Sequence, residues 1–111
     1  MSARVLGNKY HNIKTDGYDS KAEARKAAEL SLLQDAGIIS DLAEQVEFEL
    51  LPKQNPIYPR GLVYRADFVF FTKEGKRVIL DVKGYKTAIY VLKKRLMKQL
   101  LGLDILEEWN G

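Results

Sequence analysis

Charged side chains interrupt the two most apolar stretches of this sequence. Asp67 stands in "YRADFVFF", directly before four apolar residues, and both Asp81 and Lys83 stand in "RVILDVKG". Alternate residues of a β-strand lie on one face, so Asp81 and Lys83 should point to the same side. A carboxylate buried without a partner costs several kcal/mol or takes up a proton. Both aspartates therefore need a cation or hydrogen-bond donors nearby.

The short connection between these stretches predicts how the aspartates meet. A hairpin that turns near Glu74–Gly75 pairs residues whose numbers sum to about 148–150, which brings Asp67 opposite about position 81 to 83. Two facing carboxylates repel each other unless a cation lies between them. We therefore expect Asp67 and Asp81 to hold a divalent ion. The carbonyl of Val82 would be a further ligand, and Lys83 would lie beside the ion.

The composition restricts the kind of metal and of catalysis. The chain has no cysteine and a single histidine, His11, which excludes thiolate sites and a cysteine nucleophile and argues against histidine-rich sites. Oxygen ligands suit hard ions, so Mg²⁺ or Mn²⁺ is the expected cofactor.

Structural roles could also explain each of these residues. Asp81 and Lys83 could form a surface salt bridge at a strand end, and Asp67 could accept hydrogen bonds from a loop backbone. Glu23 is the fourth residue of "SKAE", which reads as a capping box at a helix start. The same glutamate could instead face the sheet and reach a metal ion. The pattern alone favours the capping role, and the two roles compete for one carboxylate.

Two helices are predicted to flank the strands. Residues 21–36 follow Ser20, a good N-cap residue, and precede Gly37, a good residue to end a helix. Residues 87–102 form the second helix and end at Gly102. Apolar residues recur at helical spacing in both helices: Ala24, Ala27, Ala28 and Leu32 in the first, and Ile89, Leu92, Leu96 and Leu100 in the second.

Four strands complete the predicted fold. "VEFEL" alternates, with Val46, Phe48 and Leu50 expected inward and the two glutamates outward. Residues 51–61 hold all three prolines and read as a loop, 62–71 and 77–83 form an antiparallel hairpin, and 103–109 add a short strand. This order predicts the α/β class, with one mixed β-sheet flanked by helices.

The chain-level properties predict one domain, residues 1–111, with residues 1–19 as an N-terminal arm or hairpin turning at Asp16–Gly17. No apolar run approaches the about 20 residues that cross a bilayer, and no signal peptide is apparent, so we expect a cytoplasmic protein without membrane contact. The net charge is +3 and the pI about 9.1. Basic residues gather after the polar strand end, as DNA binding requires: Lys83, Lys86, Lys93, Lys94, Arg95 and Lys98.

The order of acidic and basic residues resembles the PD-(D/E)XK nuclease superfamily. The matching residues are Glu23 on the first helix, Asp67 in "YRADF", and "DVK" from Asp81 to Lys83; Ala66 replaces the proline of the motif. The blocks "GYDSKAEA", "YRADFVF" and "DVKG" are closest to small phage-type members. The chain also looks like archaeal-type Holliday junction resolvases and the catalytic domain of a transposon end-cutting nuclease. The resemblance implies a restriction-endonuclease-like core.

The resemblance further implies metal-dependent hydrolysis of DNA phosphodiester bonds. Asp67 and Asp81 would hold Mg²⁺, Lys83 would act electrostatically, and Glu23 would join the site. The expected DNA contacts are Tyr85, Lys86, Lys93, Lys94 and Lys98, although a solvated helix face explains the lysines equally well. Tyr90 fits either the core or the site.

The leading hypothesis is a Holliday junction resolvase that works as a homodimer, because a junction needs two matched cuts. Three alternatives remain open: a nicking or end-processing nuclease that acts with partner proteins, a non-catalytic DNA-binding protein on a degenerate nuclease fold, and an unrelated RNA-binding protein.

Overall fold

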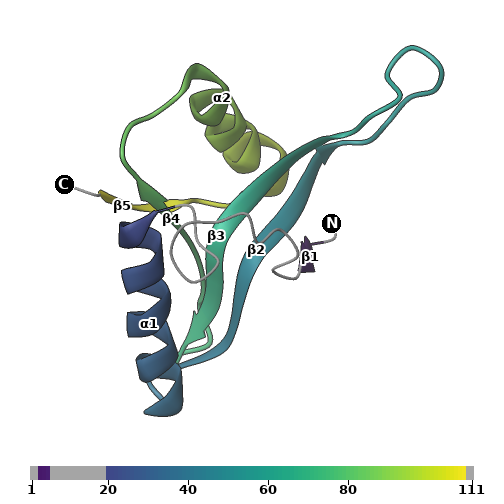
Figure 1. The fold of residues 1–111 in the computed structure, drawn as a ribbon. Helices are drawn as coiled ribbons and strands as arrows, with labels where there is room; N and C mark the ends of the chain where they lie inside the picture. Colours follow the sequence, from purple (N-terminus) through teal and green to yellow (C-terminus); the bar gives the residue numbers. More distant parts are fainter. Residues whose placement is uncertain (1–2, 6–19, 110–111) are drawn as a thin grey trace.

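A computed structural model describes residues 3–5 and 20–109 of the chain. Its elements are β1 (Ala3–Val5), α1 (Lys21–Asp35), β2 (Ile39–Leu51), β3 (Leu62–Thr72), β4 (Arg77–Lys83), α2 (Ala88–Leu96), a π-helical turn η1 (Met97–Leu101) and β5 (Leu106–Trp109). The strands form one sheet in the order β1-β2-β3-β4-β5 (Figure 1). Only the β4–β5 pair is parallel. The predicted α/β class and mixed sheet are confirmed.

Helix α1 begins and ends where its capping residues predict. The Ser20 hydroxyl accepts a hydrogen bond from the Glu23 N–H (3.0 Å). At the other end Gly37 has φ +77°, a conformation that glycine adopts without strain. The Gly37 N–H bonds to the Gln34 carbonyl and the Ile38 N–H to the Leu33 carbonyl. These bonds satisfy the last carbonyls of the helix as a Schellman motif does.

The apolar residues at helical spacing in α1 coincide only in part with its buried face. Glu23, Lys26, Ala27 and Leu30 are buried, whereas Ala28 is exposed and Leu32 is 69% exposed. Alanine buries little apolar area, so an alanine-rich helix does not define its inner face by composition. The helix instead turns two charged side chains toward the sheet, and this orientation brings Glu23 to the candidate site.

Strand β2 starts seven residues before the predicted segment 46–50, at Ile39. Its pairing with β3 shifts between Ser40 and Ala43, and both Asp41 and Gln45 have positive φ values. These irregularities remove the period-2 pattern from "ISDLAEQ", so this part of the strand could not be predicted from the pattern. The regular part agrees with prediction, because Val46, Phe48 and Leu50 are all buried.

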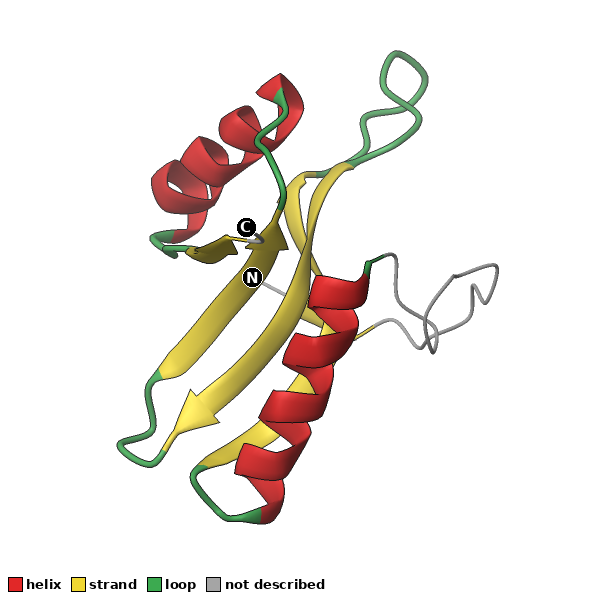
Figure 2. Ribbon diagram, turned by 60° about the vertical axis from the view of Figure 1, so that its left-hand side comes forward, coloured by secondary structure: helices red, strands yellow, loops and turns green. Residues whose placement is uncertain are grey.

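The two helices cover opposite faces of the sheet (Figure 2). Ile79 and Leu80 are consecutive on β4 and therefore point to opposite faces. Ile79 belongs to the core cluster that contains Tyr90 and Met97, on the side of α2 and η1. Leu80 belongs to the cluster that contains Leu30 of α1. The strands β3 and β4 are thus enclosed on both sides at the point where the candidate site lies.

Three of the four apolar residues predicted at helical spacing in the second helix are exposed. Thr87 caps α2 by accepting a hydrogen bond from the Tyr90 N–H (3.1 Å). Ile89, Leu92 and Leu100 are 53%, 49% and 44% exposed, so most of this apolar series lies outside the core. Buried instead are Tyr90 and Met97, and partly buried are Leu96 and Leu101. The π-helical turn changes the residue spacing after Leu96, which an ideal 3.6-residue period does not anticipate.

The strands near the two chain ends agree with the predictions only in part. Strand β5 pairs with β4 as a parallel strand, within the predicted segment 103–109. Strand β1 pairs antiparallel with β2 and was not predicted. The predicted turn at Asp16–Gly17 lies outside the described residues. Within residues 20–109, no helix is long and apolar enough to cross a membrane.

Candidate functional site

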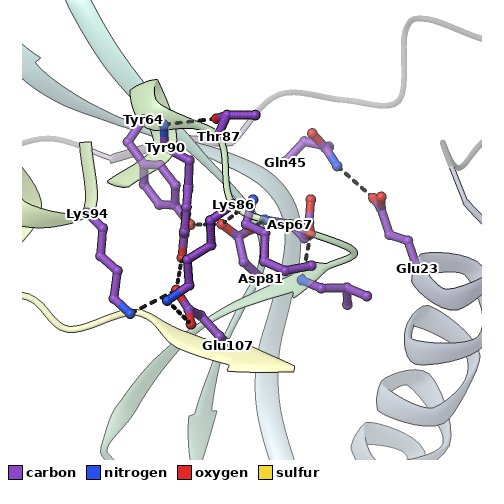
Figure 3. A network of polar contacts seen from close by, with 12 residues as sticks. Glu23, Gln45, Tyr64, Asp67, Asp81, Lys86, Thr87, Tyr90, Lys94 and Glu107 are labelled. Atoms are coloured by element: carbon purple, nitrogen blue, oxygen red, sulfur yellow. Dashed lines mark hydrogen bonds and ion pairs between the residues drawn. The ribbon is translucent and has the colours of Figure 1, made fainter. Parts of the chain in front are cut away.

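Asp67 and Asp81 meet where strands β3 and β4 diverge. The regular ladder runs from the Phe71–Arg77 pair to the Phe68–Leu80 pair, so its next step brings the two aspartates opposite each other. At this point, hydrogen bonds between side chain and backbone take the place of the backbone–backbone bonds of the ladder. The Asp67 N–H donates to Asp81 Oδ1 (2.9 Å), and the Val82 N–H donates to Asp67 Oδ2 (2.9 Å) (Figure 3). The predicted proximity of the two carboxylates is confirmed.

The Asp81 carboxylate is held from three sides. It is 1% exposed. Beyond the bond from the Asp67 N–H, its Oδ2 accepts a hydrogen bond from the Tyr64 hydroxyl, and Lys83 Nζ lies 3.4 Å from the same oxygen. Burial and the charge of Asp81 raise the pKa of Tyr64, so this hydroxyl keeps its proton and remains a donor. Asp81 is therefore fixed in one orientation.

Lys83 lies between Asp81 and an aromatic ring of the second helix. Its Nζ is 3.9 Å from the centroid of Tyr90, a distance typical of a cation–π contact. The Tyr90 hydroxyl in turn donates to Glu107 Oε2 of β5 (2.7 Å). Tyr90 is 7% exposed. Both sequence-based roles for Tyr90 therefore apply, since it packs in the core and contacts the candidate catalytic lysine.

Glu23 belongs to the helix cap through its backbone and reaches toward the strands with its side chain. Its backbone N–H bonds to Ser20 at the helix cap, while its carboxylate accepts a bond from Gln45 Nε2 (3.1 Å). Gln45 lies opposite Asp67 in the register of β2 and β3, between the pairs Glu44–Phe68 and Val46–Ala66. Figure 3 shows Glu23 on α1 reaching toward the strands through Gln45. The buried carboxylate thus faces the candidate site.

Asp67 carries the clearest electrostatic sign of crowded negative charge. Burial, followed by the charges of Asp81 and Glu23, raises the pKa of Asp67 to about 8. The Val82 N–H and Lys83 oppose this shift but do not cancel it. A carboxyl group destabilised in its charged form by other carboxylates is one that a cation would stabilise.

The donor set fits a hard cation that keeps part of its water shell. Among the described residues, no group of three or more His, Cys, Asp or Glu side chains is arranged to hold a metal ion alone. Mg²⁺ commonly uses one or two protein carboxylates and completes its shell with water and substrate phosphate. Asp67 and Asp81 supply such a pair, and each ionised carboxylate has about four acceptor positions, more than their hydrogen bonds occupy.

The predicted DNA contacts have different surroundings. Tyr85 is 75% exposed. Lys86 and Lys94 lie 3.3 and 2.8 Å from the Glu107 carboxylate, and Lys93 is half-buried on α2. Lys98 pairs with Asp104 (3.1 Å), but both side chains are largely exposed, and such pairs contribute little stability. DNA contact by these lysines stays a prediction.

Glu107 is the centre of a second polar cluster. It accepts hydrogen bonds from Tyr90 and Lys94 and pairs with Lys86. Burial acts to raise its pKa, but the bonds from Lys94, Tyr90 and Lys86 lower that pKa to about 2. Glu107 is therefore ionised at neutral pH and fixes α2 to β5.

Three residues near the site could not be identified from the sequence. Tyr64 reads as an ordinary core aromatic of its strand, and Glu107 as one of several acidic residues near the end. Both carry a weak signal, because a polar tip in a core needs a partner. Nothing in the sequence predicts that Gln45 lies beside the site, because its position depends on the irregular part of β2.

Comparison with known proteins identifies a family. The family profile described as "Protein of unknown function (DUF1064)" matches residues 6–109. This chain belongs to the DUF1064 family. No curated protein and no solved structure matches it. The DUF1064 description names no activity, so the resemblance to PD-(D/E)XK nucleases stays a prediction.

Proposed function

We propose that this DUF1064 protein is a metal-dependent DNA endonuclease with a restriction-endonuclease-like core, and that it resolves four-way junctions. One observation carries the proposal: Asp67 and Asp81 meet between two core strands, with Lys83 3.4 Å from Asp81. Glu23 faces the same place from α1 through Gln45. This set of side chains has the composition that hydrolysis of a phosphodiester requires.

Each side chain has a role that follows from its contacts. Asp67 and Asp81 would hold Mg²⁺ or Mn²⁺, together with the Val82 carbonyl. When bound, the ion would polarise the scissile phosphate and supply an activated water. Lys83 contacts a carboxylate and an aromatic ring, so it serves as a fixed cation that offsets charge growing on the phosphate rather than as a base.

Glu23 would act at the edge of the site. Its carboxylate is linked to the strands of the site through Gln45. From there it would orient a water molecule or bind a second ion. Gln45 is the positioning residue for this carboxylate.

Junction resolution is supported by the symmetry of the substrate. A four-way junction needs two matched cuts, and a homodimer with two-fold symmetry supplies two sites at a fixed separation.

A second candidate is a non-catalytic DNA-binding protein on the same fold. The favouring observation is that Asp81 already accepts bonds from Tyr64 and the Asp67 N–H. Such bonds explain the buried carboxylates structurally, without an ion.

Cleavage by an Asp81→Asn variant separates the two candidates. We expect the purified protein to cut a synthetic four-way junction with Mg²⁺ and not with EDTA. Loss of one ligand removes several kcal/mol of charge stabilisation, so Asp81→Asn should cut at least about 10³-fold more slowly. It should bind the junction as well as the wild type or better, because a repulsive charge is gone.

Asp104→Asn is the matched control, because its side chain is 80% exposed and pairs only with Lys98 among the described contacts. Wild-type rates for Asp81→Asn would refute the mechanism. Absence of cutting by every preparation, with Mg²⁺-independent binding, would support the non-catalytic candidate. Equal cutting of junction, linear duplex and flap substrates would exclude junction resolution and favour a nicking or end-processing nuclease.

A further inference from the structure

The only tryptophan of the chain lies at the surface beside the candidate catalytic lysine. Trp109 is 51% exposed, and the register of β4 and β5 pairs it with Lys83. Hydrogen-bonded strands lie about 4.8 Å apart, so the ring lies one strand away from the proposed site. A half-exposed aromatic ring beside a polar site is available to stack on a ligand.

Positive charge lies next to this ring, and a second exposed aromatic residue lies in the loop that contains Lys86. Lys86 Nζ is 5.5 Å from the Trp109 ring centroid, and Lys83 lies on the neighbouring strand. Tyr85, in the loop that joins β4 to α2, is 75% exposed. Aromatic rings among lysines are the arrangement with which proteins bind single-stranded nucleic acids, because rings stack on bases and lysines contact phosphates.

Trp109 also borders a small cavity whose charges are balanced. The cavity has a volume of about 230 Å³ and lies where Arg25, Lys26 and Glu29 of α1 approach Val82, Glu108 and Trp109. Lys26 pairs with Glu29 (3.1 Å) and with Glu108 (2.8 Å). These pairs leave little net attraction for a phosphate but supply both hydrogen-bond donors and acceptors. A cavity of this size is smaller than the about 300–1,000 Å³ typical of drug-sized ligands.

The two sides of Trp109 match the two parts of a nucleotide. Lysines on one side suit the anionic phosphate, and the cavity on the other suits a flat, neutral base with polar edges. We propose that Trp109 stacks on an unpaired nucleobase of the DNA strand whose phosphate lies at Lys83, with the edge of the base in the cavity. The inference rests on the proposed function and names its substrate class: DNA with unpaired nucleotides at the cut, such as a branch point. Continuous duplex keeps its bases stacked and offers no free face.

Tryptophan fluorescence tests the stacking directly, because Trp109 is the sole tryptophan. The protein is titrated in EDTA with a single-stranded thymidine oligonucleotide and with a blunt duplex of the same length. We expect the single strand to quench the fluorescence of Trp109 in a saturable manner, and the duplex to leave it nearly unchanged. Equal quenching by both ligands, or by neither, overturns the inference.

Variants measure the contribution of the ring to affinity. By fluorescence anisotropy of a labelled single strand, Trp109→Ala should bind about tenfold more weakly, and Trp109→Phe should stay within about threefold of the wild type. Circular dichroism verifies folding, and the Phe variant keeps the test valid if the Ala variant unfolds. Tyr58→Ala is the matched control, since Tyr58 is 61% exposed in the loop 52–61 and should bind normally. Unchanged affinity of both Trp109 variants overturns the inference.

Failure of this inference differs from failure of the proposed function. Binding in EDTA does not require cleavage, so stacking on Trp109 can hold for a protein that never cuts. Conversely, a nuclease that cuts junctions with Mg²⁺ but shows no quenching retains the proposed function and loses this substrate class.

Discussion

At the residue scale, the pairing of Asp67 with Asp81 places two carboxylates where strands normally exchange backbone hydrogen bonds. Each carboxylate accepts a bond from the backbone of the opposite strand. These bonds hold both side chains in position, but they do not remove the repulsion between the charges. Under the proposed function, an incoming cation would find both carboxylates already in position, which favours specific metal binding.

The raised pKa of Asp67 predicts a pH-dependent effect of Mg²⁺ on stability. The folded protein holds a proton on Asp67 up to a pKa of about 8, whereas the unfolded chain releases it near the ordinary value of about 3.9. Between these values the folded state binds more protons, so the metal-free protein loses stability as pH rises. Mg²⁺ replaces the proton, so the rise in melting temperature on adding Mg²⁺ should grow from pH 6 to about pH 8.5.

Thermal melts with EDTA and with Mg²⁺ at several pH values check this expectation. Asp67→Asn is the comparison, because it cannot ionise. In EDTA its stability relative to the wild type should increase with pH, and it should gain much less from Mg²⁺. A stabilisation by Mg²⁺ that is independent of pH, or equal in both proteins, would contradict the electrostatic account of Asp67.

At the element scale, α2 reaches the site through Tyr90. Its ring lies against Lys83 at 3.9 Å, and its hydroxyl is held by Glu107 at 2.7 Å. Lys94 of the same helix binds that carboxylate as well. Helix α2 and strand β5 thus hold in place the Tyr90 ring that the Lys83 ammonium contacts.

Tyr90 is therefore predicted to be a positioning residue for Lys83. Tyr90→Leu removes the ring, and loss of a cation–π contact of about 1–2 kcal/mol should slow single-turnover cleavage about tenfold. DNA affinity should change little, since Tyr90 is buried. Tyr90→Phe keeps the ring and should cut within about threefold of the wild type. Lys83→Ala gives the lowest cleavage rate expected, because it removes the ammonium itself. A wild-type cleavage rate for Tyr90→Leu, with normal folding, would contradict the role.

The elements also explain which parts of the structure could be read from the sequence. Caps and turns depend on local chemistry, so Ser20, Gly37 and the hairpin at Glu74–Gly75 predicted the ends of α1 and the register that joins Asp67 to Asp81. Helix rotation depends on tertiary packing. The alanines of α1 and the π-helical turn after α2 left the inner faces undetermined, so the apolar series indicated these faces only in part.

The same distinction applies to the site. The residues on regular strands, Asp67, Asp81 and Lys83, were predictable because strand alternation and hairpin register are nearly geometric rules. Gln45 was not, because it lies in the irregular part of β2 with φ 55°. Glu107 was not, because only the parallel pairing of β5 with β4 brings it to α2.

At the scale of the whole molecule, the acidic residues of the site and the lysines around it lie at different depths. Asp81 is buried and Asp67 is half-buried, while lysines from the β4–α2 loop and α2 lie toward the surface. Lys86 and Lys94 share Glu107, whereas Lys98 is only loosely paired. A DNA backbone would therefore meet net positive charge before it approaches the carboxylates, which an ion must neutralise.

The exposed residues of α2 lead to a prediction about assembly. Ile89 and Leu92 of α2 and Leu100 of η1 are 44–53% exposed, and exposed apolar residues that lie near one another commonly pack against another subunit. We expect the protein to sediment as a homodimer at micromolar concentration. Leu92→Glu should shift it to the monomer, because burial of a charge opposite its own symmetry copy is costly.

Leu32→Glu is the matched control, since Leu32 is 69% exposed on α1 and lies outside this group. Analytical ultracentrifugation should show a dimer for Leu32→Glu and a monomer for Leu92→Glu with an unchanged circular dichroism spectrum. On a junction, the monomeric variant should leave single nicks where the dimer makes paired cuts, since the two incisions then become independent events. Paired cuts by a protein that sediments as a monomer at the assay concentration would show that resolution does not depend on this face of α2.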